Sequence, residues 1–149
     1  RTFSKPNRHP GGRVFTVAYC SLLNTEHHSL KILDNELHWH SVKKLCDMAF
    51  DHKEILDVCY AWLQKRMLEH PLGLNLLPEK FSLRELQNLY EAIYGNELDK
   101  RNFTRKILSL DILHKLNEKE KASSRKGSYY FVFDEKRYKK LETEGVKFI

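Results

Sequence analysis

The chain has 149 residues, of which 41% are hydrophobic and 31% are charged, and its mean hydropathy is −0.60. This length fits one domain or two small ones. No apolar run reaches the roughly 20 residues that a membrane-spanning helix needs, and no charged-then-apolar leader is seen. Three cysteines, Cys20, Cys46 and Cys59, lie outside any CxxC pair, so a reduced, cytoplasmic protein is the simplest interpretation.

Positive charge is concentrated in one part of the sequence. The net charge is +6 at pH 7, and nine basic side chains face only three acidic ones between residues 100 and 128. Such a basic patch predicts a polyanionic partner, nucleic acid first. A solvated surface that happens to be basic is an equal alternative on charge alone.

The first 42 residues are predicted to form strands and turns. Residues 1–12 are rich in Pro and Gly, as turns are. Residues 13–23 are nearly all β-branched, aromatic or apolar, which predicts a strand covered on both faces. A turn and an edge strand are expected at 24–34. The alternation in 36–42, with Leu37 and Trp39 apolar, predicts a half-buried strand.

Helical periodicity begins at Asp51. Apolar residues then recur at spacings of three and four, which predicts an amphipathic helix built on Ile55, Val58, Cys59, Trp62, Leu63 and Met67. Pro71, Gly73 and Pro78 interrupt this pattern. We therefore predict a domain boundary here, with one domain at 1–70 and a second at 71–149.

Two further helices are predicted directly after the boundary. Ser82 and Glu85 have the spacing of a capping box, which marks a helix start. Gly95 is a typical stop signal. Asp99 can cap the next helix, which is expected to run to about Leu110. Two helices joined by a short turn indicate a helix-turn-helix.

A wing is expected to follow. Residues 111–116 predict a short strand, 117–128 a charged loop and 129–133 a strong strand. Residues 134–145 predict a closing helix that starts at the cap Asp134 and ends at Gly145. The predicted fold class is α+β.

The helix at 99–110 is the predicted DNA-reading helix. Phe103, Ile107 and Leu110 fall on one face, and Arg101 and Arg105 fall on the opposite one. Arg can bond to guanine and Asn to adenine in the major groove, and the second helix of a helix-turn-helix enters that groove. The predicted DNA contacts are Arg84, Lys100, Arg101, Asn102, Thr104, Arg105 and Lys106, with Lys119, Lys121, Arg125 and Lys126 in the wing. An ordinary solvated amphipathic helix is the alternative.

Other chemistry has weaker support. His38 and His40 would lie on one face of a strand and could hold a metal. His27, His28 or His52 could supply further ligands, but the spacing does not require it, and histidines without a metal are the favoured alternative. Cys20 and Cys59 have no local signature of an activated nucleophile. Phosphate-binding and catalytic motifs are not found. We expect no catalytic residue, no metal and no cofactor.

Two parts of the sequence suggest a family. The stretch NLLPEKFSLRELQNLYEAIYGNELDKRNFTRKILSLDIL (75–113) is similar to the C-terminal winged helix of the Nudix-related transcriptional regulators. Residues 1–23 resemble the middle of the family's Nudix-like domain, and 38–56 resemble its end, at Trp39, Leu45 and the run 49–52. The resemblance implies the C-terminal part of a Nudix-like effector and dimerisation domain at 1–70, followed by a winged helix.

The sequence departs from the family pattern in two places. Some members of the family end the wing with an Arg-Gly-Arg-Pro-like run. In this chain the corresponding residues, 125–128, are Arg-Lys-Gly-Ser. A Nudix box needs R-E-x-x-E-E to hold metal, and the nearest match, at 84–88, lacks both later glutamates. A catalytic box would therefore have to lie upstream of Arg1.

The resemblance implies a dimeric regulator, in the first place a repressor, that binds palindromic double-stranded DNA and senses a small effector such as ADP-ribose or a sugar. Arg8 and Arg13, beside the turn-rich loop, are candidate effector contacts. The alternative is a catalytically active Nudix pyrophosphatase of the ADP-ribose type with an accessory winged helix. A third hypothesis, a winged helix that binds only proteins, predicts an apolar or acidic exposed face on 99–110.

Overall fold

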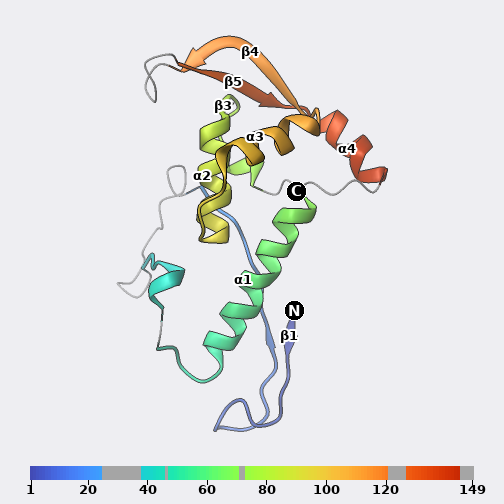
Figure 1. Cartoon of the computed structure of the whole chain (residues 1–149). Coiled ribbons are helices and arrows are strands. Elements are labelled where there is room, and N and C mark those ends of the chain that lie inside the picture. Colours follow the sequence, from blue (N-terminus) through green and yellow to red (C-terminus); the bar gives the residue numbers. More distant parts are fainter. Residues whose placement is uncertain (25–37, 46, 71–72, 121–126, 145–149) are drawn as a thin grey trace. The chain divides into compact units, whose positions relative to one another are not determined.

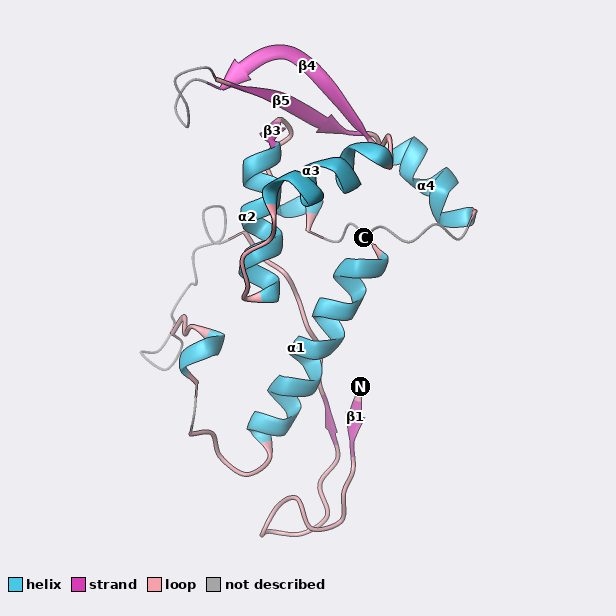
Figure 2. Cartoon of the chain, in the orientation of Figure 1, coloured by secondary structure: helices cyan, strands magenta, loops and turns pink. Residues whose placement is uncertain are grey.

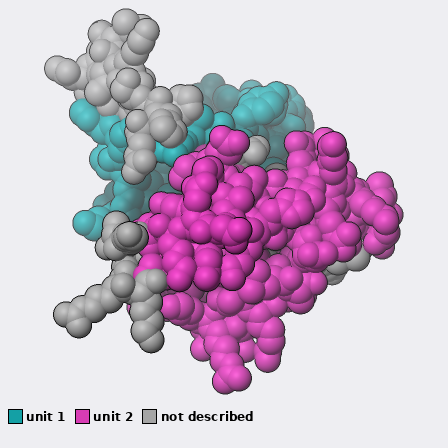
Figure 3. Space-filling view, turned by 90° about the horizontal axis from the view of Figure 1, so that it is seen from above, with its two compact units in different colours: residues 1–63 teal, residues 64–149 magenta. Residues whose placement is uncertain are grey.

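The computed structural model describes residues 1–24, 38–45, 47–70, 73–120 and 127–144 (Figure 1). The chain divides into two compact units, residues 1–63 and 64–149 (Figure 3). The division lies within helix α1 (His52–Glu69), a few residues before the predicted boundary. Whether residues 1–70 form part of a Nudix-like domain stays a prediction.

The first unit contains a small hairpin. Strands β1 (Thr2–Phe3) and β2 (Thr16–Val17) pair antiparallel, and the first turns of α1 complete the unit. The predicted strand at 13–23 is wrong in length and in burial, because only Thr16 and Val17 pair and Tyr19 is 91% exposed. A strand forms where a partner is available, and β1 offers only two residues.

The predicted strand at 36–42 is also wrong for its described part. Residues 38–41 have no regular structure, and Val42–Lys44 form a 3₁₀ turn. Apolar and polar residues alternate in this segment, but among the described residues no strand pairs with it. The strand expected at 24–34 lies outside the described residues, apart from Asn24.

The buried core lies in the second unit. All the buried apolar side chains among the described residues fall between positions 67 and 131, and they are Met67, Leu74, Phe81, Leu86, Tyr90, Ile93, Phe103, Ile107, Ile112 and Phe131. They come from the end of α1, the 3₁₀ turn Leu74–Leu76, helices α2 (Leu83–Tyr94) and α3 (Lys100–Ser109), the sheet, and Ile112 in the short segment between α3 and the sheet. This burial confirms the predicted face of α3 at Phe103 and Ile107. On α1 only Met67 is buried, and Trp62, which was predicted on the apolar face, is 52% exposed.

Local chemistry fixes the limits of α2. The hydroxyl of Ser82 accepts from the backbone N–H of Glu85, and the Glu85 carboxylate accepts from the Ser82 backbone at 2.7 Å, so the predicted capping box is confirmed. Gly95 ends the helix with φ at 74°, a left-handed conformation that glycine adopts without strain.

A three-stranded antiparallel sheet covers the helices. Its order is β3 (Phe81–Ser82), β5 (Ser128–Phe133), β4 (Leu113–Glu120). The predicted strand at 129–133 is confirmed. Strand β4 continues to Glu120 through part of the predicted loop, and β3 was not predicted at all. Helix α4 (Glu135–Thr143) follows with Asp134 as its cap, as expected, while Gly145 lies outside the described residues.

The second unit thus combines two helices joined by a tight turn with an antiparallel hairpin, and α2 contacts α3, β3 and β5 (Figures 1 and 2). The predicted α+β class is confirmed. No helix among the described residues has the length and apolar character to cross a membrane.

Candidate nucleic-acid interface

A hydrogen-bonded turn sets the relation between α2 and α3. The Glu91 carboxylate accepts from the backbone N–H of Leu98 at 2.9 Å, and Gln87 donates both to the Leu98 carbonyl and to Glu91. The Leu98 N–H, followed by the Gln87 amide, lowers the pKa of Glu91 below its ordinary value. Gln87 and Glu91 of α2 thus bond to both backbone groups of Leu98, and these bonds tie the residue just before the α3 cap to α2.

Helix α3 begins at a side-chain cap. Asp99 accepts from the backbone N–H of Asn102 at 2.7 Å, and the predicted cap is confirmed. Phe103 and Ile107 are buried, and the Phe103 ring lies 5.5 Å from that of Tyr90. This apolar face fixes the rotation of the helix, so its opposite face is turned outward.

The outward face of α3 is basic. Lys100, Arg101, Arg105 and Lys106 are exposed, as is Asn102, and Thr104 is half-buried. Among the described residues none of these four basic side chains makes an ion pair. An open depression on this surface is lined by Asp99, Lys100, Arg101, Thr104 and Arg105. The structure therefore brings together most of the predicted α3 contacts.

One contact on this face was not predicted. Arg105 donates from Nη2 to Oδ1 of Asn102 at 2.9 Å. The two side chains lie one helical turn apart, where side chains meet. The bond engages the Asn102 amide oxygen, and both residues are exposed.

The flanking residues are placed only in part. Arg84 is exposed on α2, and Lys119 is exposed on β4. Lys121, Arg125 and Lys126 lie outside the described residues. Lys115, exposed on β4, was absent from the predicted contacts, because a single lysine in a short strand gives no signal of its own. A role in DNA binding stays a prediction for all of these residues.

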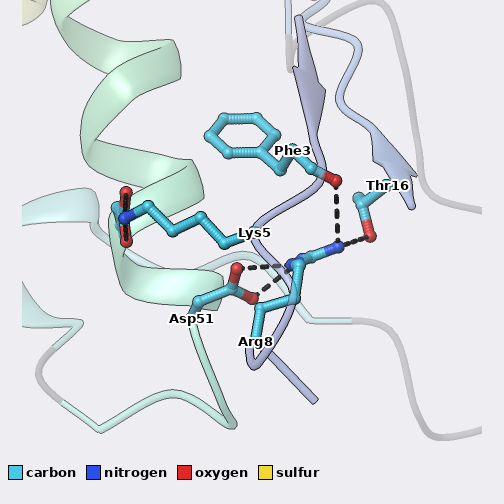
Figure 4. A network of polar contacts seen from close by, with 6 residues as sticks. Phe3, Lys5, Arg8, Thr16 and Asp51 are labelled. Carbon is cyan, nitrogen blue, oxygen red and sulfur yellow. Dashed lines mark hydrogen bonds and ion pairs between the residues drawn. The ribbon is translucent and has the colours of Figure 1, made fainter. Parts of the chain in front are cut away.

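The predicted effector contacts lie in the first unit. Arg8 donates from Nε and Nη2 to the Asp51 carboxylate at 2.6 and 2.8 Å, and from Nη1 to Thr16 at 2.5 Å (Figure 4). Its side chain is 4% exposed. The Arg8 guanidinium also lowers the pKa of Asp51. Arg8 thus joins the hairpin to the start of α1. An effector that bound Arg8 would have to share its guanidinium with Asp51 and Thr16. Arg13 is exposed, with its guanidinium 5.3 Å from the Phe15 ring.

The rings of His38 and His40 lie edge to face, 6.3 Å apart. The part of the chain that the structure describes contains no group of three or more His, Cys, Asp or Glu side chains placed to hold a metal ion.

A helix-turn-helix, an outward basic second helix and an antiparallel hairpin directly after it together define the winged-helix class of domains. Residues 73–133 match the family model described as the NrtR DNA-binding winged helix domain.

Two kinds of relatives agree with this match. The ADPR responsive transcriptional repressor NtrR of Acinetobacter baylyi is 31% identical over 126 residues, which are 83% of this chain and 50% of that protein. The crystal structure of Shewanella oneidensis NrtR complexed with a 27mer DNA matches with a TM-score of 0.70 and 22% identity, over 93% of this chain and 64% of the other. The structure of that protein alone gives a TM-score of 0.65, over 89% and 62%.

The predicted resemblance is confirmed: the chain is similar to the NrtR proteins, which are Nudix-related transcriptional regulators. It spans about half the length of the curated relative that it matches.

Proposed function

We propose that this chain binds double-stranded DNA through α3 and acts in a transcriptional repressor that responds to a small effector. The observation that carries the proposal is the exposed basic face of α3, which is held outward by Phe103 and Ile107 and makes no ion pair within the described residues. An exposed guanidinium that makes no ion pair can bond to the O6 and N7 of guanine. The basic face also opposes the hypothesis of a winged helix that binds only proteins.

The test is DNA binding by the Arg105→Ala variant. Duplexes are first selected from a random pool with the unaltered chain, and affinities are then measured by fluorescence anisotropy at several salt concentrations. Loss of one bidentate base contact is expected to weaken binding to the selected duplex by roughly five- to 150-fold. It should also relax the preference at one base pair.

Arg105→Lys is the matched control, because it keeps the charge and loses the planar fork. It should retain the salt dependence of the unaltered chain and lose the base preference. If Arg105→Ala kept the full affinity and the full base preference of the unaltered chain, α3 would not be the helix that reads DNA.

The effector proposal draws on the relative from Acinetobacter baylyi, which is named as ADPR responsive. We propose that an ADP-ribose-like nucleotide or a sugar metabolite binds to the Nudix-like region and changes DNA affinity. A homodimer on a palindromic site, and a cytoplasmic location, belong to the same proposal. Adding ADP-ribose and several pentoses in turn to the anisotropy assay tests the effector class.

The same relatives are regulators, so we propose a sensing role for this chain and no hydrolytic one. The only segment that approaches a Nudix box, residues 84–88, lies in α2 of the winged helix. Incubation of the chain with ADP-ribose and Mg²⁺ should release no AMP. Release of AMP would favour the pyrophosphatase alternative.

A further inference from the structure

Cys20 and Cys59, the cysteines among the described residues, lie against each other. Cys20 follows strand β2, Cys59 lies in helix α1, and a side-chain hydrogen bond joins their thiols. The two residues are far apart in the sequence and form no CxxC pair. The fold of the first unit therefore creates this dithiol, which the spacing in the sequence did not indicate.

The dithiol belongs to a wider contact between the hairpin and α1. Arg8 donates to the Asp51 carboxylate at 2.6 and 2.8 Å, and Lys5 donates to the two carboxylate oxygens of Glu54 at 2.6 and 2.9 Å (Figure 4). Asp51 and Glu54 lie at the start of α1, and Cys59 lies further along the same helix. The thiol contact therefore continues a set of polar contacts that hold the N-terminal segment on the helix.

The backbone beside Cys20 is also fixed. The Ala18 N–H donates to the Arg1 carbonyl at 3.0 Å, which extends the bonding between the two strands beyond Val17. Cys20 comes two residues later. Its sulfur is therefore attached to a part of the chain whose position the hairpin sets.

The two thiols differ in accessibility. Cys20 is exposed and Cys59 is half-buried, so a reagent in solution reaches Cys20 first. Desolvation of the sulfur, followed by the hydrogen bond with Cys59, raises the pKa of Cys20. The reduced pair thus stays protonated at neutral pH. The hydrogen bond leaves the two sulfur atoms a short approach away from the S–S bond length of about 2.05 Å.

We propose that Cys20 and Cys59 are a site of reversible oxidation, at which a small disulfide of the glutathione class converts the dithiol into a disulfide that ties the hairpin to α1. The Cys20 thiolate attacks one sulfur of the small disulfide, forms a mixed disulfide and expels one small thiolate. Cys59 then gives up its proton and attacks the Cys20 sulfur, which forms the Cys20–Cys59 bond and expels the second thiolate. The chain loses two electrons and two protons, and the small disulfide becomes two thiols.

This modification goes beyond the proposed DNA binding, because it involves the first unit alone. Disulfides in reducing compartments are mostly transient and redox-sensing. A cross-link stabilises a fold mainly by removing freedom from the unfolded chain. Oxidation would therefore stabilise the hairpin that carries Arg8, the candidate effector contact, and reduction would release it.

The test uses the Cys46→Ser chain, in which Cys20 and Cys59 are the remaining thiols. The chain is brought to equilibrium with mixtures of reduced and oxidised glutathione, once folded and once in concentrated urea, and is then quenched with acid and alkylated. Mass spectrometry should show a monomer that has lost two hydrogen atoms, and a non-reducing digest should join the peptides of the two cysteines. The equilibrium constant should be at least about tenfold larger in the folded chain, which corresponds to about 30 mV in reduction potential.

Two single-thiol chains, Cys20→Ser/Cys46→Ser and Cys59→Ser/Cys46→Ser, are the matched controls. Each should form only the mixed disulfide with glutathione, and the chain that keeps the exposed Cys20 should form it faster. Circular dichroism establishes that each variant is folded without urea. The inference is overturned if the equilibrium constant is no larger in the folded chain than in urea. It is also overturned if the mixed disulfide is the final product in the Cys46→Ser chain, or if the new disulfide joins two chains.

Discussion

Glu91 gives the turn before α3 a dependence on pH. Its half-buried carboxylate accepts from the Leu98 N–H and from Gln87, which lowers its pKa. A carboxyl group whose pKa is lower in the folded state than in the unfolded state stabilises the fold above its unfolded pKa, which is about 4.3 for glutamate. That stabilisation is lost as the pH falls through the folded value.

We therefore expect Glu91→Gln to be less stable than the unaltered chain at neutral pH, and the difference to shrink as the pH falls through the lowered pKa of Glu91, where its carboxylate becomes as uncharged as glutamine. Urea unfolding followed by circular dichroism over this pH range measures the difference. A gap that stays constant over the whole range would mean that the charge of Glu91 contributes nothing to the turn.

At the scale of the element, the start of α3 depends on Asp99. Its side chain satisfies the N–H of Asn102, which has no partner within the helix. Asp99→Ala should lower the free energy of unfolding by about 1 kcal/mol, while Asp99→Ser, which keeps a capping oxygen, should cost much less. The midpoint of urea unfolding, at an unchanged slope, reports this difference. Equal losses in the two variants would assign the effect to the charge and not to the cap.

The same elements show what the sequence could predict. The limits of α2, α3 and α4 depend on local chemistry at Ser82, Gly95, Asp99 and Asp134, and each is confirmed within a residue or two. The α3 face was predictable because helical spacing alone places Phe103 and Ile107 inward.

The strands were harder to predict because pairing across the chain defines them. Strand β3 has only two residues and exists through its pairing with Phe131 and Tyr130. The end of β4 is polar throughout and pairs with the start of β5. The strand expected at 13–23 was apolar enough, yet most of it pairs with nothing described.

At the scale of the molecule, burial is uneven. The fully buried apolar side chains of the described residues all belong to the unit of residues 64–149, while the first unit exposes Phe15, Tyr19, Trp39, Phe50 and Trp62. Because apolar burial is the main term that offsets the entropy of folding, we expect a fragment of residues 64–149 to fold alone. Its melting temperature should lie within about 5 °C of that of the winged helix in the whole chain.

The two tryptophans offer a convenient probe for this prediction. Trp39 and Trp62 both lie in the first unit and are 58% and 52% exposed. Far-ultraviolet circular dichroism should therefore report the melting of the winged helix, whereas tryptophan fluorescence should not follow it. A fragment that shows no cooperative transition, or a fluorescence change that coincides with the main transition, would contradict the separation of the two units.

The hydrogen bond from Arg105 to Asn102 has a consequence for how an operator sequence could change over time. An amide whose oxygen is already engaged offers a base mainly its N–H₂ group, so the identity of residue 105 partly decides what residue 102 can read. Substitutions of residues in contact do not add. A change of base preference would then require substitutions at both residue 102 and residue 105, together with changes in the operator. A single mutation in the protein or in the DNA would rarely restore recognition.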